Sequence, residues 1–189
     1  MENSLHIASP LAARRPKGAH RFEGFSPKRA RRLTFFRRAV VDEWLQLEAD
    51  PSVTSFCERP GYVRFDGQRR LADFWVEFIE HNKLVVLCEV CEGEGDIRPG
   101  RDIDEAALPV RRVTSADHSA ASMWIDNWQR MLPYVTASQG IIRASLSSEV
   151  ERFVSSPQPL LAIERRFSKG DPASCGGVLA AARGAGTGA

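Results

Sequence analysis

The chain has 189 residues, enough for one compact domain with tails but not for two domains of ordinary size. It is 43% hydrophobic and 26% charged, the composition of a globular protein, and no apolar run approaches the ~20 residues that a membrane-spanning helix needs. No stretch near the N-terminus resembles a signal peptide, and the four cysteines are irregularly spaced. We therefore expect a cytoplasmic protein with reduced thiols, not a membrane protein or a disulfide-stabilised secreted one.

The net charge of +2 is unevenly distributed along the chain. Residues 1–38 contain ten Lys or Arg and two Glu, a local charge of +8, and the rest of the chain carries −6. Such a segment can neutralise phosphates of a nucleic acid, or it can be a solvated tail with no specific partner. We predict a flexible basic arm at 1–25, a single folded domain at 26–167 and a disordered Gly/Ala-rich tail at 168–189.

The first predicted element is a helix over residues 36–49, which ends at Asp50-Pro51. Apolar residues recur along it at three- and four-residue spacing: Phe36, Ala39, Val40, Trp44 and Leu47. Glu43 lies at the edge of this apolar stripe. A carboxylate there is costly unless it is paired or coordinates a cation, so two interpretations remain open: a side chain that reaches solvent, or one with a partner.

A β-meander is predicted next. Residues 60–66 form a strand, Asp66-Gly67 is a hairpin turn, and residues 71–79 alternate as a second strand. A polar loop at 80–82 leads to the apolar, β-branched run 83–91, which is suited to a central buried strand.

A second long helix is predicted over 116–132, with Ser115 as its cap and Pro133 just after its end. Its expected buried stripe comprises Ala120, Met123, Trp124, Trp128 and Met131. A shorter helix near 148–154 and an apolar segment at 160–163 follow. The order helix, antiparallel strands, helix indicates an α/β or α+β sandwich.

Acidic residues in the meander suggest a metal site. A three-residue turn between the last two strands would place Asp73 opposite Glu89, with Cys91 two residues further along the same face. A two-residue turn would place Asp73 opposite Val90 and break the pair. Two converging carboxylates, with Glu43 on the neighbouring helix, could hold Mg²⁺ or Mn²⁺, which favour oxygen ligands and can activate a water for hydrolysis.

Four phrases occur in a characteristic order and spacing: LEADPSVTSFCERP (47–60), YVRFDGQRRLADFWVEF (62–78), LVVLCEV (84–90) and WIDNWQRMLPYV (124–135). Together they resemble the N-terminal endonuclease domain of the TnsA family, the transposon-end nuclease subunit of heteromeric transposases. The resemblance spans roughly residues 26–165. It implies a restriction-endonuclease-like α/β core, with a central mixed or antiparallel sheet flanked by helices and a PD–(D/E)xK site.

By position, the resemblance makes Asp73 the metal-binding aspartate of the family's PDF phrase, although Ala72 precedes it instead of proline. Glu89 and Cys91 occupy the outer positions of the family's ExK phrase. Cys91 therefore stands where the family has the lysine that orients the attacking water, and a thiol cannot supply that fixed positive charge.

Two further positions depart from the family. Its helix glutamate would fall at Val40, with Glu43 one turn later as a replacement, and Arg59-Pro60 stands at its QP phrase. Lys83 is about six residues from Glu89, roughly 20 Å at ~3.3 Å per residue, and so cannot replace the lysine.

The resemblance implies two possible functions, and the charge pattern adds a third. The first is Mg²⁺- or Mn²⁺-dependent DNA strand cleavage at a transposon end, with Asp73 and Glu89 as metal ligands and Glu43 assisting. The second is a non-cleaving relative that binds DNA and assembles with transposase and ATPase subunits, and the third is a globular protein whose basic arm meets an acidic protein partner. No glycine-rich phosphate loop follows a strand, so we expect no nucleotide cofactor. The DNA contacts are assigned to Arg29, Arg31, Arg32, Arg69 and Arg70.

Overall fold

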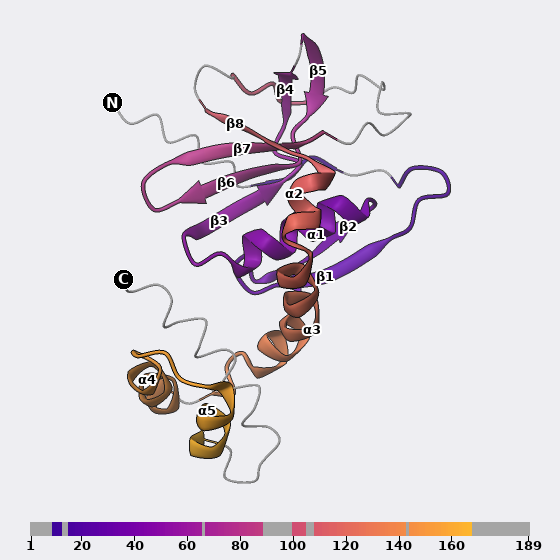
Figure 1. The fold of residues 1–189 in the computed structure, drawn as a ribbon. Coiled ribbons are helices and arrows are strands. Elements are labelled where there is room, and N and C mark those ends of the chain that lie inside the picture. The colour runs from indigo at the N-terminus through magenta and orange to yellow at the C-terminus, as the bar shows by residue number, and fades with distance from the viewer. Residues whose placement is uncertain are drawn as a thin grey trace.

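In the computed structural model, residues 9–12, 15–65, 67–88, 100–104, 108–142 and 144–167 are described, and Figure 1 shows the eight strands and five helices within them. The strands are β1 (Phe22–Ser26), β2 (Arg31–Phe35), β3 (Val53–Glu58), β4 (Tyr62–Phe65), β5 (Gln68–Leu71), β6 (Phe74–Phe78), β7 (Asn82–Leu87) and β8 (Val110–Val113). The helices are α1 (Arg38–Ala49), α2 (Ser115–Ala120), α3 (Ser122–Ser138), α4 (Ala144–Phe153) and α5 (Leu160–Phe167).

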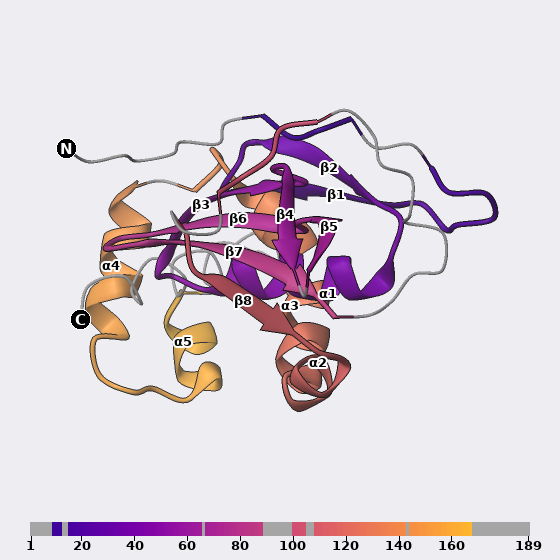
Figure 2. The ribbon, with the colours of Figure 1, turned by 90° about the horizontal axis from the view of Figure 1, so that it is seen from above.

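A four-stranded mixed sheet forms the centre of the fold, in the order β3-β6-β7-β8. β6 is antiparallel to β3 and to β7, whereas β8 is parallel to β7. The hairpins β1-β2 and β4-β5 are separate two-stranded sheets, and Figures 1 and 2 show α1 and the β4-β5 hairpin on opposite sides of the central sheet. The prediction of an α/β fold with a mixed sheet flanked by helices is confirmed.

Both faces of the sheet are buried, each in its own apolar cluster. Phe74 and Leu87 face the cluster that includes α1 and α3, whereas Trp75 and Val86 face the cluster completed by Val63 of the β4-β5 hairpin. Successive residues of a strand point to opposite faces, so a strand buried on both sides must be apolar at every position. This explains the continuous apolar run of β7.

The C-terminal end of α1 is held by the turn between β1 and β2. Lys28 donates from Nζ to the carbonyl oxygen of Leu47 at 2.8 Å, which satisfies one of the carbonyls left open at a helix end. Glu48 is fully buried and accepts from the Ser26 hydroxyl at 2.7 Å and from the backbone N–H of Lys28 at 2.8 Å. These bonds satisfy the buried carboxylate and fix the hairpin to the helix.

β1 begins at Phe22, within the segment 1–25 that the sequence analysis assigns to a basic arm. Gly24 lies within β1. In the structure an added Cβ at this glycine would lie 2.4 Å from the Trp44 ring, so the glycine permits close packing against α1.

Two strands of the central sheet, β3 and β8, were not predicted from the sequence. The predicted strand 60–66 corresponds to β4, the predicted strand 71–79 covers the end of β5 and all of β6, and the run 83–91 corresponds to β7. The segment before β3 carries the helix-ending Asp50-Pro51, and β8 contains the charged pair Arg111-Arg112. Neither segment shows the apolar alternation or the unbroken apolar run on which the other strand predictions rest.

The helix predicted over 116–132 is two helices, α2 and α3, separated at Ala121. The predicted end at Pro133 is wrong, because α3 continues through that proline to Ser138. A proline inside a helix removes one hydrogen bond, and here the buried residues on either side of it keep the helix packed on the body. Among the described residues, no helix has the length and apolar character needed to cross a membrane.

The predicted buried stripe of this helix is also wrong. Met123 is 79% exposed and Trp124 is 54% exposed, so the predicted core role of Trp124 is not borne out, whereas Trp128 is buried as predicted. The buried face of α3 consists of Ile125, Trp128, Leu132, Val135 and Ser138. Ile125 and Leu132, which are buried, each follow directly after a predicted core residue, Trp124 and Met131, so the buried face was predicted one residue out of position.

The cap of α2 is Thr114, not the predicted Ser115. The Thr114 hydroxyl accepts from the backbone N–H of Asp117 at 3.3 Å, and Thr114 donates to the Asp117 carboxylate from both its hydroxyl and its backbone N–H at 2.7 Å. This reciprocal arrangement is a capping box. The side-chain bond from Thr114, followed by the backbone bond from the same residue, lowers the pKa of Asp117.

Replacing Thr114 with valine is expected to raise the pKa of Asp117 back towards its ordinary value, because the hydroxyl donor is lost. Since the folded-state pKa lies below the unfolded one, the contribution of Asp117 to stability is present above the unfolded pKa of ~3.9 and is lost as the pH falls through the folded pKa. An NMR titration of the Asp117 carboxyl carbon measures the shift. Thr114→Ser should keep the low pKa, and an unchanged pKa in Thr114→Val would contradict the assignment.

Candidate functional site

Asp73 lies directly before β6, is 6% exposed, and joins three elements. Its Oδ2 accepts from the backbone N–H of Leu87 at 2.8 Å, and its Oδ1 accepts from Nη2 of Arg37, the residue that precedes α1. Its backbone carbonyl is turned away from β7 and accepts from the N–H of Arg59 at 2.9 Å. The carboxylate thus replaces the backbone carbonyl in the β6-β7 ladder and is also ion-paired to the start of α1.

The predicted pairing of Asp73 with Glu89 is wrong in register. The turn between β6 and β7 is shorter than predicted, because the N–H of Phe78 bonds to the carbonyl of His81 at 2.8 Å. Phe74 pairs with Val85, which shifts the strands by three residues, about 10 Å at ~3.3 Å per residue, from the predicted register. Glu89 and Cys91 themselves lie outside the described residues.

Glu43 on α1 has partners and does not reach solvent, so the interpretation that it does is wrong. It is fully buried, its Oε2 lies 3.2 Å from Nε2 of His118 on α2, and its Oε1 lies 3.5 Å from Nη1 of Arg111 on β8. The Glu43 carboxylate therefore connects α1 to two later elements. Val40, at the position of the family's helix glutamate, is packed in the apolar core.

The two described carboxylates of the predicted metal site, Asp73 and Glu43, have positively charged or N–H partners within the chain. A cation at Asp73 Oδ1 would meet the Arg37 guanidinium, and one at Glu43 would meet His118 and Arg111. Within the described ranges, no group of three or more His, Cys, Asp or Glu side chains is placed to hold a metal. Each buried carboxylate is instead compensated by a cation or an N–H donor of the chain itself, as buried charges require.

Arg31, one of the predicted DNA contacts, is engaged within the fold. Its two terminal nitrogens donate to the two oxygens of Glu58 at 2.8 and 2.5 Å, and Glu58 is 1% exposed. The hydrogen bond to Glu58 is the main cause of the raised pKa of Arg31. Arg59 adds a third contact to the same carboxylate at 3.4 Å, so one buried negative charge faces two guanidinium groups.

The other four predicted DNA contacts differ in their exposure and in their partners within the fold. Arg29 donates to the Ser55 hydroxyl at 2.5 Å. Arg69 pairs with Asp102 at 2.7 Å and lies over the Tyr62 ring at 3.8 Å. Arg32 is exposed and Arg70 is half-buried. Of the five predicted residues, Arg32 is therefore the one most accessible to a phosphate.

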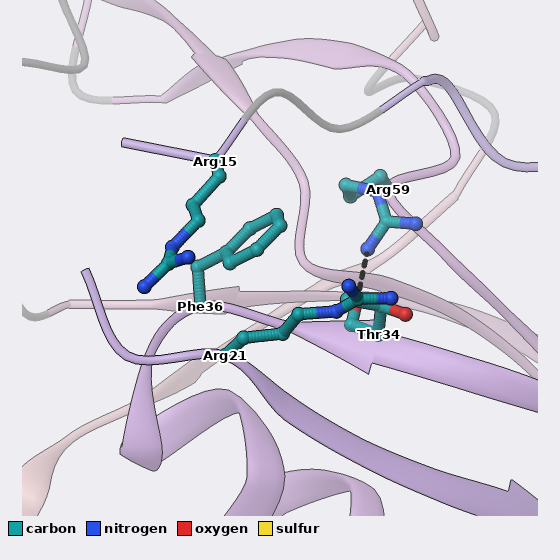
Figure 3. A pocket seen from close by; sticks show the side chains of 5 residues that line it. All are labelled: Arg15, Arg21, Thr34, Phe36 and Arg59. Atoms are coloured by element: carbon teal, nitrogen blue, oxygen red, sulfur yellow. Dashed lines mark hydrogen bonds between the residues drawn. The ribbon is translucent and has the colours of Figure 1, made fainter. Parts of the chain in front are cut away.

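The sequence did not single out a concave basic surface that the fold creates, which we call the basic hollow (Figure 3). It has a volume of about 410 Å³ and is lined by Arg15, Arg21, Thr34, Phe36 and Arg59. These residues come from the predicted arm, from β2 and its end, and from the turn after β3. Only the fold brings them together; the one sequence signal was the excess of basic residues before residue 38.

The Arg59 side chain lines the basic hollow and is held in place by hydrogen bonds. Its Nε donates to the carbonyl of Leu11 and its Nη1 to the carbonyl of Thr34, both at 3.1 Å. Its backbone has a φ of +48°, a left-handed conformation that is rare for a residue with a side chain and that tends to occur at functional positions. Burial lowers the pKa of Arg59, and the carboxylate of Glu58 acts against that shift.

Backbone neighbours link the basic hollow to Asp73. Phe36 directly precedes Arg37, whose guanidinium binds the Asp73 carboxylate, and the N–H of Arg59 donates to the Asp73 carbonyl. The candidate functional site is therefore the basic hollow together with the adjoining Arg37–Asp73 pair.

Comparison with models of known protein families gave no match, and comparison with curated protein sequences gave no significant match.

Proposed function

We propose that this protein is a DNA-associated, non-cleaving relative of the restriction-endonuclease-like nucleases that acts as an assembly subunit in DNA transposition. In this role it contacts DNA and docks beside transposase and ATPase subunits. The observation that carries the proposal is the ion pair between Arg37 and Asp73, at the aspartate that the sequence resemblance assigns to metal binding.

The ion pair favours a structural use of Asp73. An arginine side chain is charged at every physiological pH, so Arg37 supplies a permanent counter-charge to the carboxylate. A metal bound at Asp73 would be repelled by the Arg37 guanidinium, and breaking a largely buried pair costs several kcal/mol. Glu43, the other carboxylate of the predicted metal site that the structure describes, is likewise paired with His118 and Arg111.

Support for DNA association comes from the charge distribution. The +8 of residues 1–38 provides the sequence-independent attraction to phosphates that dominates DNA affinity. The folded part of this segment places Arg15 and Arg21 at the basic hollow, and Arg32 is exposed on β2. A cleavage-deficient protein with such a surface would still position DNA for other subunits.

A plasmid-nicking assay tests the proposal. We expect the wild-type chain with Mg²⁺ or Mn²⁺ to nick supercoiled DNA no faster than Asp73→Asn, and calorimetry to detect no Mn²⁺ binding that depends on Asp73. The same protein should bind duplex DNA with an affinity that falls steeply with salt.

The opposite result has a clear meaning. Metal-dependent nicking that disappears in Asp73→Asn would support the alternative of an active nuclease with Asp73 and Glu89 as metal ligands. The bond from the Leu87 N–H, which orients the Asp73 carboxylate, is the observation that favours this alternative. Absence of DNA binding at low salt would contradict both.

A further inference from the structure

We propose that the basic hollow binds one unpaired nucleotide of a DNA strand, with its base on the Phe36 ring and its phosphate on the guanidinium groups beside that ring. This inference rests on the proposed association with DNA and names the form of DNA that this site takes. It concerns residues other than the five arginines assigned to DNA contact from the sequence.

The charge of the basic hollow suits a phosphate. Its lining carries three guanidinium groups and no carboxylate. Arg21 pairs with Glu23 at 2.5 Å, but both side chains are about half exposed, so this pair contributes little and can exchange for a phosphate. Arg15 is exposed and bonds the Ala19 carbonyl through Nε at 2.9 Å. Arginine suits phosphate because its planar donors match the phosphate oxygens.

Arg59 adds charge that the fold only partly compensates. It shares the single carboxylate of Glu58 with Arg31, which leaves one positive charge in excess beside the basic hollow. The three bonds from its guanidinium to Leu11, Thr34 and Glu58 hold it in place before any ligand arrives. A preorganised cation loses little entropy when an anion binds.

Phe36 distinguishes an unpaired nucleotide from a bare phosphate. Its half-buried ring lies between the guanidinium groups of the basic hollow in Figure 3. Aromatic rings within basic grooves serve as stacking platforms for the bases of single strands. In a duplex the bases are stacked on one another, so only the phosphates of a duplex would reach this surface.

The test compares single-stranded and duplex DNA. Fluorescence anisotropy with the full chain would measure binding to a labelled oligothymidylate and to a duplex of equal length. Phe36→Leu keeps the apolar volume but removes the stacking surface, so we expect about tenfold weaker binding to the single strand and unchanged binding to the duplex. Phe36→Tyr keeps the ring and should keep the affinity.

Salt dependence separates the two parts of the site. Arg21→Gln removes one phosphate contact, so the slope of log affinity against log salt for the single strand should fall by about 0.7, whereas Phe36→Leu should leave that slope unchanged. The matched controls are Tyr134→Leu and Arg130→Gln, an exposed aromatic and an exposed arginine on α3 outside the basic hollow. Neither control should change binding.

The following results would contradict the proposed nucleotide site. Equal loss in Phe36→Leu and Tyr134→Leu, or no loss in Phe36→Leu while duplex binding persists, would overturn the unpaired-nucleotide site and leave the proposed function intact. Tighter binding of oligouridylate than of oligothymidylate would assign the site to RNA. If the wild-type chain binds neither single-stranded nor duplex DNA, the proposed function fails as well. Thermal unfolding of every variant confirms that it is folded.

Discussion

Replacing Arg37 with methionine is expected to lower the free energy of unfolding by about 3 kcal/mol. The Asp73 side chain is 7% exposed, and the substitution removes the guanidinium that pairs with its Oδ1. Methionine retains most of the aliphatic stem of arginine, so the loss reports mainly on the charge. Urea unfolding at fixed pH and ionic strength measures it.

The neighbouring residue provides a matched control. Arg38 is 49% exposed and pairs with Asp42 on the first turns of α1, a surface ion pair of the kind that contributes about 0.5 kcal/mol or less. Arg38→Met should therefore have little effect. Combining Arg37→Met with Asp73→Asn should recover part of the loss, because the neutral amide oxygen can still accept from Leu87 without a buried charge. Equal losses in Arg37→Met and Arg38→Met would contradict the structural role of the pair.

The elements that the sequence predicted correctly are those with a local pattern. α1 was predicted from its three- and four-residue apolar spacing, and β7 from an unbroken apolar run. β3 and β8 were missed, because β3 is recognised only by its pairing with β6, and β8 carries the exposed Arg112 and the half-exposed side chain of Arg111. Pairing between distant segments leaves no periodic signal within either one.

The site was predicted in part for the same reason. Asp73 was identified by its match to the PDF phrase, and in the structure it contacts three elements. Its partner Arg37 was not identified, because an ion pair across 36 positions of sequence depends on how the start of α1 meets the start of β6. The pairing with Glu89 failed because register follows both the length and the position of the turn, and the observed turn after Phe78 is shorter and begins earlier than the predicted loop 80–82.

Replacing Arg31 with methionine is expected to lower the free energy of unfolding by about 3 to 5 kcal/mol, at least as much as Arg37→Met. Glu58 would keep only the 3.4 Å contact with Arg59 while its side chain remains 2% exposed. An unpaired buried carboxylate is far more costly than an exposed one. Urea unfolding of Arg31→Met beside Arg32→Met measures the difference.

Arg31 and Arg32 are adjacent in sequence but point to opposite sides of β2. The alternation of a strand places Arg31 with the buried residues Leu33 and Phe35, and places Arg32 in solvent. Arg32→Met should therefore leave stability within about 0.5 kcal/mol of the wild type, as is usual for surface substitutions. If Arg32 contacts DNA, the same variant lowers the salt slope of duplex binding by about 0.9.

The double variant Arg31→Met, Glu58→Leu tests whether stability depends on the ion pair itself or only on side chains of similar size at these two positions. Two apolar side chains of similar size can replace a buried ion pair with little loss, so the double variant should be more stable than Arg31→Met alone. If Arg31→Met and Arg32→Met prove equally stable and equally weak in DNA binding, the two arginines act alike, as expected if both contact DNA. A large stability loss confined to Arg31→Met shows that adjacent arginines of one basic segment have different tasks, one within the fold and one at its surface.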